Sequence, residues 1–207
     1  MIPSLNEPEI VFGLCSPIGT NNSAVTEIIE KALKTYGYTT KRLKATTVMK
    51  EVQIKSDEFT IIDRPYEARY DSHIRYENKI REIFGHPSAI AMLCCAAIRN
   101  IRRSDVGDAD NYRNSTAYVV DQFKRVEEIS LFRQIYGRLF VLISIYSDKD
   151  QRIQRISDAI AKDSGAGRPE EFHQHEARML VYRDESEEKI PNGQRLRDAF
   201  SLADLFI

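Results

Sequence analysis

The feature that most constrains the fold lies at the start of the chain: an apolar run, a polar turn and an amphipathic helix. The run IVFGL, residues 10–14, is bounded by turn residues and fits a buried strand. Apolar residues then recur at helical spacing over residues 25–36, and Gly37 follows as a helix stop. Residues 39–43 predict a second strand, so the chain opens as a βαβ unit.

The rest of the chain continues this alternation of strands and helices. We expect helices at 66–84, 90–101, 125–136, 153–160 and 170–182, strands at 117–120, 139–146 and 203–207, and loops at 104–115, 162–169 and 184–193. Such alternation predicts an α/β fold, a P-loop nucleotide-kinase-like parallel sheet with helices on both faces. We expect one domain over residues 1–207, with a helical insertion at about 64–104.

Composition excludes several classes of protein. The 207 residues are 42% hydrophobic and 29% charged, as in ordinary globular proteins. With 30 basic and 31 acidic side chains there is no strong DNA-binding signal. No apolar run approaches the roughly 20 residues of a membrane span. Because there is also no secretory signal and only three cysteines, we expect a cytoplasmic protein with reduced thiols and no membrane partner.

The turn after the first strand resembles a phosphate-binding loop. Such a loop has the pattern G-x-x-x-x-G-K-[ST], whose backbone N–H groups wrap a phosphate while the lysine neutralises it and the hydroxyl ligates Mg²⁺. The corresponding residues here, taken as the candidate nucleotide site, are Ser16, Pro17, Ile18, Gly19, Thr20, Asn21, Asn22 and Ser23. The helix N-terminus can still hold an anion, but Asn22 replaces the lysine. A tight strand–helix turn without a ligand is the alternative.

Three further side chains are candidates for the same site. Asp121 follows a buried strand, where P-loop enzymes hold a Mg²⁺-coordinating carboxylate, so Ser23 and Asp121 are the candidate Mg²⁺ ligands. Taken alone, Asp121 is more often a helix cap or a loop carboxylate, but the loop and this strand-end carboxylate support each other, because ligands in such sheets lie at the carboxyl ends of the strands. Arg152 and Arg155 lie on the helix after the strongest strand, where kinases carry lid arginines, although a solvated helix face explains them too.

Two clusters look like metal ligands but have simpler explanations. His173 and His175 lie two apart, so on a helix they point in different directions and make poor joint ligands. Cys94 and Cys95 are adjacent, so they cannot both face one site from a helix, and core packing accounts for Cys94, which lies on an apolar helical stripe.

Four segments of the chain resemble the N-terminal half of bacterial anti-phage deoxycytidylate (dCTP-type) deaminases. In order they are IVFGLCSPIG, YENKIREIFG, AYVVDQFKRVEEISLFRQIYG and GQRLRDAFSLADLFI. That half of the family is similar to a P-loop nucleotide kinase, and a zinc deaminase domain follows it. The resemblance implies a nucleotide-binding role for residues 16–23 and Asp121, and also for Asn78, Arg81, Gln194 and Asp198.

The chain departs from that family because it lacks the H-x-E and P-C-x-x-C segments that hold zinc in the deaminase. We therefore expect no zinc in this chain, and a deaminase domain as a partner in cis or in trans. By this resemblance we expect the chain to be either an excised N-terminal domain or a stand-alone form whose deaminase is separate or absent.

Three functional hypotheses remain open from the sequence. The first is a nucleotide-sensing domain that binds a nucleotide triphosphate (ATP, GTP or a deoxynucleotide, possibly with Mg²⁺) and regulates a deoxycytidine deaminase. The second is an active nucleotide or dephospho-coenzyme A-like kinase, in which another cation such as Arg64, Arg152 or Arg155 replaces the lysine. The third is a docking or homo-oligomerisation module in which the loop has lost its function.

Overall fold

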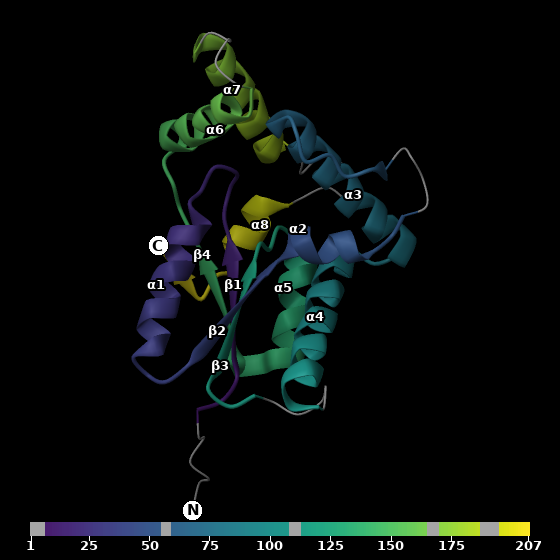
Figure 1. The fold of residues 1–207 in the computed structure, drawn as a ribbon, viewed down its shortest axis with the longest axis vertical. Coiled ribbons are helices and arrows are strands. Elements are labelled where there is room, and N and C mark those ends of the chain that lie inside the picture. Colours follow the sequence, from purple (N-terminus) through teal and green to yellow (C-terminus); the bar gives the residue numbers. More distant parts are fainter. Residues whose placement is uncertain (1–6, 55–58, 108–112, 165–169, 187–194) are drawn as a thin grey trace, which may run out of the picture.

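In the part of the chain that the structure describes, the protein forms a five-stranded parallel sheet with helices on both faces (Figure 1). The computed structural model describes residues 7–54, 59–107, 113–164, 170–186 and 195–207. The strands are β1 (Ile10–Cys15), β2 (Thr39–Lys44), β3 (Thr116–Asp121), β4 (Phe140–Ser144) and β5 (Leu205–Phe206). Their order is β2-β3-β1-β4-β5, and every pair of neighbours is parallel. The predicted α/β class is confirmed.

Helices occupy the connections between the strands. The described helices and 3₁₀ turns are α1 (Asn22–Lys34), α2 (Ala45–Val48), η1 (Met49–Glu51), α3 (Tyr66–Phe84), α4 (Ala89–Val106), α5 (Val126–Tyr136), η3 (Gly137–Leu139), α6 (Lys149–Ser164), α7 (Glu170–Ser186) and α8 (Leu196–Phe200). None of them is both long enough and apolar enough to cross a membrane.

The alternation of side chains along β1 and β3 builds a core on each face of the sheet. Val11 and Tyr118 point to the face covered by α4 and α5, while Leu14 and Val119 point to the face covered by α1 (Figure 1). Packing explains why position 13 of β1 is a glycine: a Cβ atom at Gly13 would lie 2.7 Å from the ring of Phe123. The strand therefore needs a residue without a side chain where aromatic rings pack over it.

The third apolar cluster joins α6 and α7 into a hairpin above the carboxyl ends of the strands (Figure 1). Its buried residues include Ile156 and Ile160 of α6 and Val181 of α7, and Ile18 of the turn after β1 packs against them. The hairpin therefore rests on the segment that the sequence singled out.

Several predicted boundaries were wrong. The loop predicted at 104–115 begins later, because α4 continues to Val106, and part of it, 108–112, lies outside the described residues. The loop predicted at 184–193 also begins too early, since α7 runs to Ser186, and 187–194 lie outside the described residues. The short helices α2 and α8 were missed, because each is too short to show helical periodicity.

The aromatic cluster around Phe132 gives a test of the core. Phe132 is fully buried and its ring lies 4.9 Å from that of Phe123 and 5.4 Å from that of Phe140, between centroids. We expect Phe132→Ala to lower the free energy of unfolding by about 3–5 kcal/mol, because it leaves a cavity. Ile135→Ala, at a half-exposed position of the same helix, is the control. Urea denaturation measures both, and equal losses would contradict this account of the core.

Candidate functional site

The turn after β1 occupies the position expected of a phosphate-binding loop. β1 ends at Cys15 and α1 begins at Asn22, so residues 16–21 join the carboxyl end of the central strand to a helix N-terminus. The Asn21 side chain caps that helix by accepting a hydrogen bond from the N–H of Ala24, at 3.2 Å. The predicted strand–loop–helix arrangement is confirmed, and whether it binds a nucleotide stays a prediction.

Asn22, in the lysine position, belongs to a polar network without a cation. Its Nδ2 donates to Oδ1 of Asp121 at 2.7 Å, and its Oδ1 accepts from the Ser16 hydroxyl at 2.8 Å. Gln122 Nε2 in turn donates to the same Ser16 hydroxyl at 2.6 Å. The amide thus connects the loop to the end of β3, a contact that a lysine could not make in the same way because it accepts no hydrogen bond.

Asp121 lies at the carboxyl end of β3, as predicted, and is largely buried beside the loop. Burial raises the pKa of this carboxyl above its ordinary value, against the opposing effects of the Asn22 hydrogen bond and the nearby Lys44 and Lys124 ammonium groups. A cation bound beside the carboxylate would favour its charged form.

Arg152 and Arg155 both contact the loop from α6. Nη1 of the buried Arg152 donates to the carbonyl of Ile18 at 3.4 Å. Nη1 of the exposed Arg155 donates to the carbonyl of Gly19 at 3.4 Å and to the Ser147 hydroxyl at 3.0 Å. The structure therefore brings both predicted arginines to the loop.

A carboxylate that the sequence analysis did not single out holds the other side of the loop. Asp184 of α7 is buried, and its Oδ2 accepts from the backbone N–H of Ile18 at 2.9 Å. Its Oδ1 accepts from the Tyr70 hydroxyl at 2.9 Å and from Lys124 Nζ at 3.1 Å. One side chain thus joins the loop, α3, α7 and the segment after β3. The predicted loop at 184–193 hid it, because a carboxylate in a surface loop needs no partner.

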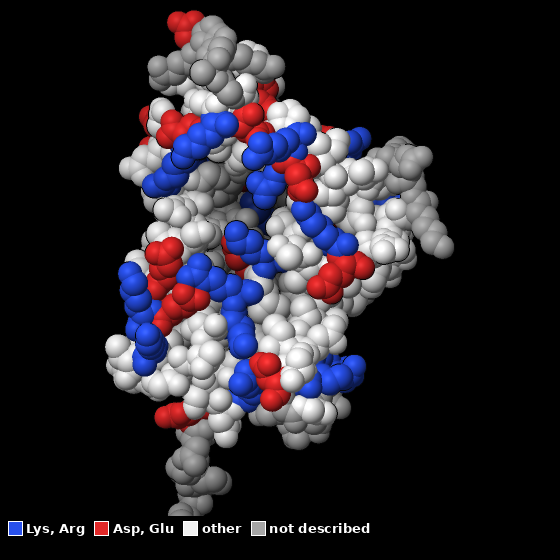
Figure 2. All heavy atoms as spheres, viewed as in Figure 1, with Lys and Arg blue, Asp and Glu red and all other residues white. Residues whose placement is uncertain are grey.

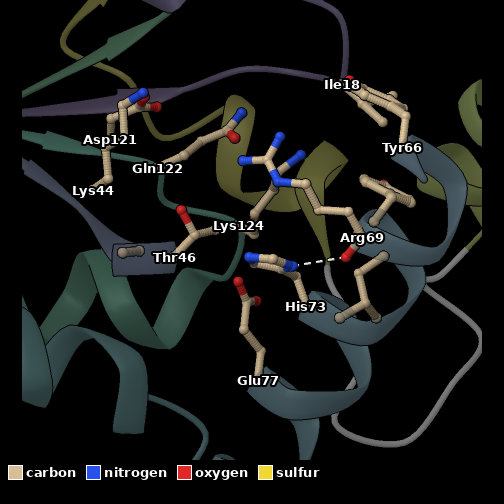
Figure 3. Close-up of a pocket in the computed structure, with 13 residues that line it drawn as sticks. Ile18, Lys44, Thr46, Tyr66, Arg69, His73, Glu77, Asp121, Gln122 and Lys124 are labelled. Carbon is tan, nitrogen blue, oxygen red and sulfur yellow. Dashed lines mark hydrogen bonds between the residues drawn. The ribbon is translucent and has the colours of Figure 1, made fainter. Parts of the chain in front are cut away.

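Two cavities flank the loop. The first, called here the α3 cavity, has a volume of about 210 Å³ and is shown in Figure 3. It is lined by Ile18, Lys44, Ala45, Thr46, Tyr66, Arg69, Tyr70, His73, Ile74, Glu77, Asp121, Gln122 and Lys124. The second, the α8 cavity, has about 410 Å³ and is lined by Pro17, Tyr146, Ser147, Arg152, Asp184, Leu196, Arg197 and Phe200. Both lie near the carboxyl ends of the strands, where parallel α/β sheets bind their ligands.

The sequence contains a pattern that indicates the α3 cavity. Tyr66, Tyr70, His73 and Glu77 recur at spacings of three or four residues, which places them on one face of α3. Lys44 and Lys124 come at or just after the ends of β2 and β3. Chemically varied side chains on one helix face, opposite charged strand ends, would have indicated this cavity.

Other candidate residues lie apart from the loop contacts. Ser23 is exposed on the first turn of α1, and its pairing with Asp121 around Mg²⁺ stays a prediction. Asn78 and Arg81 belong to a buried cluster in which Arg81 pairs with Glu77 and Glu128. Asp198 is exposed on α8, and Gln194 lies outside the described residues.

Arg64, the third cation considered as a lysine substitute, pairs with Asp163 of α6 at 3.1 Å and contacts neither Asn22 nor Asp121. Among the residues that the structure describes, no group of three His, Cys, Asp or Glu side chains is placed to hold a metal ion. A nucleotide-bound Mg²⁺ needs only one or two protein oxygens besides the phosphates.

Comparison with known proteins gives similarity of fold alone. No protein-family model and no curated protein matches the chain. Among solved structures, it is similar to a protein from Silicibacter sp. TM1040 provisionally described as a fructose transport system kinase, with TM-score 0.45 and 12% identity, covering 100% of this chain and 93% of that one. It is also similar to an uncharacterized protein from Eubacterium ventriosum, with TM-score 0.39 and 15% identity, covering 96% and 87%. Neither likeness assigns a ligand or an activity to this chain.

The close approach of the loop to α6 can be tested at Gly19. This residue has φ +81°, and a Cβ atom there would lie 2.8 Å from the carbonyl oxygen of Arg152. Gly37 has φ +80° with nothing within 4 Å of its Cβ position, so Gly37→Ala isolates the cost of the backbone conformation. We expect Gly19→Ala to cost about 1–3 kcal/mol more of unfolding free energy than Gly37→Ala, measured in urea. Equal costs would show that the loop does not pack tightly on α6.

The raised pKa of Asp121 predicts how stability changes with pH. The folded protein holds this proton more tightly than the unfolded chain, so the carboxyl's stabilising contribution is lost as pH rises through its folded pKa. Asp121→Asn keeps an acceptor for Asn22 but cannot ionise. We expect this variant to be more stable than the parent at pH 7, with a difference that shrinks toward acid pH. Asp158→Asn, at an exposed position of α6, should change little. A variant less stable than the parent at pH 7 would contradict the direction of the shift.

Proposed function

We propose that this chain is a degenerate P-loop domain that binds and senses a nucleotide and carries out little or no phosphoryl transfer. The observation that carries the proposal is the hydrogen-bonded network of Asn22. The amide in the lysine position donates to Asp121 and accepts from Ser16, so the loop keeps its connection to β3 without its catalytic charge. Phosphoryl transfer depends on that charge, whereas binding at a helix N-terminus does not.

The surroundings of the loop support phosphate binding. The Oγ1 of Thr20 is buried and has no hydrogen-bond partner among the described residues, so a ligand oxygen would satisfy it. Arg155 is exposed beside Gly19, from where its guanidinium can turn to a phosphate. Tyr146 and Phe200 line the adjacent α8 cavity and offer rings to a base. In this proposal, Asp121 and the Ser23 hydroxyl are the groups that would hold a nucleotide-bound Mg²⁺.

A more specific proposal concerns the protein domain that this chain would regulate. The segments that resemble anti-phage deoxycytidylate deaminases point to a regulatory role toward a deaminase domain in cis or in trans. In that role, nucleotide binding at the loop would alter the contact with the deaminase. The zinc chemistry would belong to the deaminase.

An active small-nucleotide kinase is the second candidate, and one observation favours it. The α3 and α8 cavities both adjoin the loop, so two ligands could lie next to it, as the donor and the acceptor of a phosphoryl group do. Lys44 and Lys124, whose charges act on Asp121, would then supply the missing positive charge.

Nucleotide binding is tested by isothermal titration with dCTP, dTTP, ATP and GTP, each with Mg²⁺. We expect saturable binding of at least one of them, and we expect Arg155→Gln to weaken it about tenfold, since a hydrogen bond to a charged group contributes about 1.5–3 kcal/mol. Arg138→Gln is the matched control, because Arg138 is an exposed arginine of η3, at the opposite end of β4 from the loop.

Absence of binding by all four triphosphates would overturn the proposal, as would equal effects of the two arginine substitutions. Sustained ATP hydrolysis or transfer to a nucleoside monophosphate, measured on the same samples, would decide for the kinase instead.

A further inference from the structure

The α3 cavity is a second place where this chain could hold a small molecule, separate from the loop's contacts with α6. It lies between α3 and the ends of β2 and β3, and side chains from all of these elements point into it (Figure 3). Its volume of about 210 Å³ is below the roughly 300–1,000 Å³ of typical ligand pockets, which restricts it to a small ligand. Figure 2 shows Lys and Arg side chains, with Asp and Glu among them, around the hollow below the α6–α7 hairpin.

The charges of the cavity favour an anion. Arg69 and Lys44 line it, and neither side chain forms a hydrogen bond or ion pair with another residue of the described ranges. The two acidic groups of the lining are already engaged: Glu77 with Arg81, and Asp121 with Asn22. Burial also raises the pKa of both carboxyls. Two cations thus remain available to a ligand, while both carboxyls of the lining already have partners within the protein.

His73 adds a hydrogen-bond acceptor of defined orientation. Its Nδ1 lies 2.7 Å from the carbonyl oxygen of Arg69, and because a carbonyl can only accept, Nδ1 carries the proton. Burial lowers the pKa of this imidazole, so it is neutral near pH 7 and Nε2 keeps its lone pair. Figure 3 shows the ring lying in the cavity with its other nitrogen turned away from the α3 backbone. That nitrogen can accept a hydrogen bond from a hydroxyl or amino group.

The remaining wall is apolar or aromatic and is held in place from behind. Tyr66, Tyr70, Ile74 and Ile18 supply this surface. The Tyr70 hydroxyl, the Ile18 N–H and the Lys124 ammonium are all hydrogen-bonded to the buried Asp184 on the far side of the wall. The wall is therefore ordered before a ligand arrives, which lowers the entropic cost of binding.

We propose that the α3 cavity binds a small phosphomonoester of a hydroxylated ring compound. Its phosphate lies at Arg69 and Lys44, its ring lies against Tyr66 and Tyr70, and a hydroxyl or amino group donates to Nε2 of His73. Both a nucleoside monophosphate and a sugar phosphate have this chemistry. The site goes beyond the proposed triphosphate site, because it uses none of the contacts between the loop and α6.

Isothermal titration distinguishes the two sources of such a ligand, with dCMP, ribose 5-phosphate, inorganic phosphate and deoxycytidine as probes. We expect saturable binding of dCMP or ribose 5-phosphate, at least tenfold tighter than that of inorganic phosphate or of deoxycytidine. Tighter binding of dCMP would assign the cavity to nucleotides, and tighter binding of ribose 5-phosphate would assign it to sugar phosphates; either result supports the proposal.

A pair of substitutions on α3 locates the binding. We expect Arg69→Gln to weaken the better probe at least tenfold. The matched control Arg75→Gln should leave it unchanged, since Arg75 pairs with Asp71 and does not line the cavity. Both arginines are exposed, so neither substitution should unfold the protein.

Three outcomes would overturn the proposal: no saturable binding of either monophosphate, binding of inorganic phosphate as tight as that of the ring compounds, or equal effects of the two substitutions. Monophosphate binding that needs Arg69 but not Arg155 would stand even if no triphosphate bound at the loop. These measurements thus distinguish a failure of the α3-cavity proposal from a failure of the proposed triphosphate site at the loop.

Discussion

The arrangement of the site depends on one buried carboxylate. Asp184 is removed from water, and an ionised group in that position is tolerated only when it is paired and hydrogen-bonded. Its three partners come from the loop after β1, from α3 and from the segment after β3, so satisfying this single charge brings together three segments that are remote in sequence. Asp184 contributes to both cavities. It lines the α8 cavity itself, and its three hydrogen-bond partners line the α3 cavity.

In the loop after β1, the residue in the lysine position has a structural role. In a catalytic phosphate-binding loop the lysine is left free to meet the outer phosphates. Here the amide of Asn22 uses both its donor and its acceptor on protein groups, Asp121 and Ser16, and the network continues to Gln122. The exchange replaces a mobile charge by a fixed neutral link between β1 and β3. These hydrogen bonds fix the loop against the end of β3.

The cations of this region come instead from positions around the loop. Lys44 and Lys124 lie at or after strand ends, Arg69 lies on α3, and Arg152 and Arg155 lie on α6. Their separation into two groups, one on each side of the loop, follows from the strand order, since β2 and β3 lie on one side of β1 and β4 on the other. Lys44, Arg69 and Lys124 therefore line the α3 cavity, and Arg152 lines the α8 cavity.

The sequence by itself determined the α/β class, the limits of α3 and the strand–loop–helix opening, because these depend on local periodicity and on turn residues that act within a few positions. It also placed Asp121 at a strand end and both α6 arginines near the loop, since the geometry of a parallel sheet makes such positions regular. Only the tertiary structure decided what Asn22 and Asp184 do. Their partners are up to 166 residues away, and no local pattern records which distant groups will satisfy a buried amide or carboxylate.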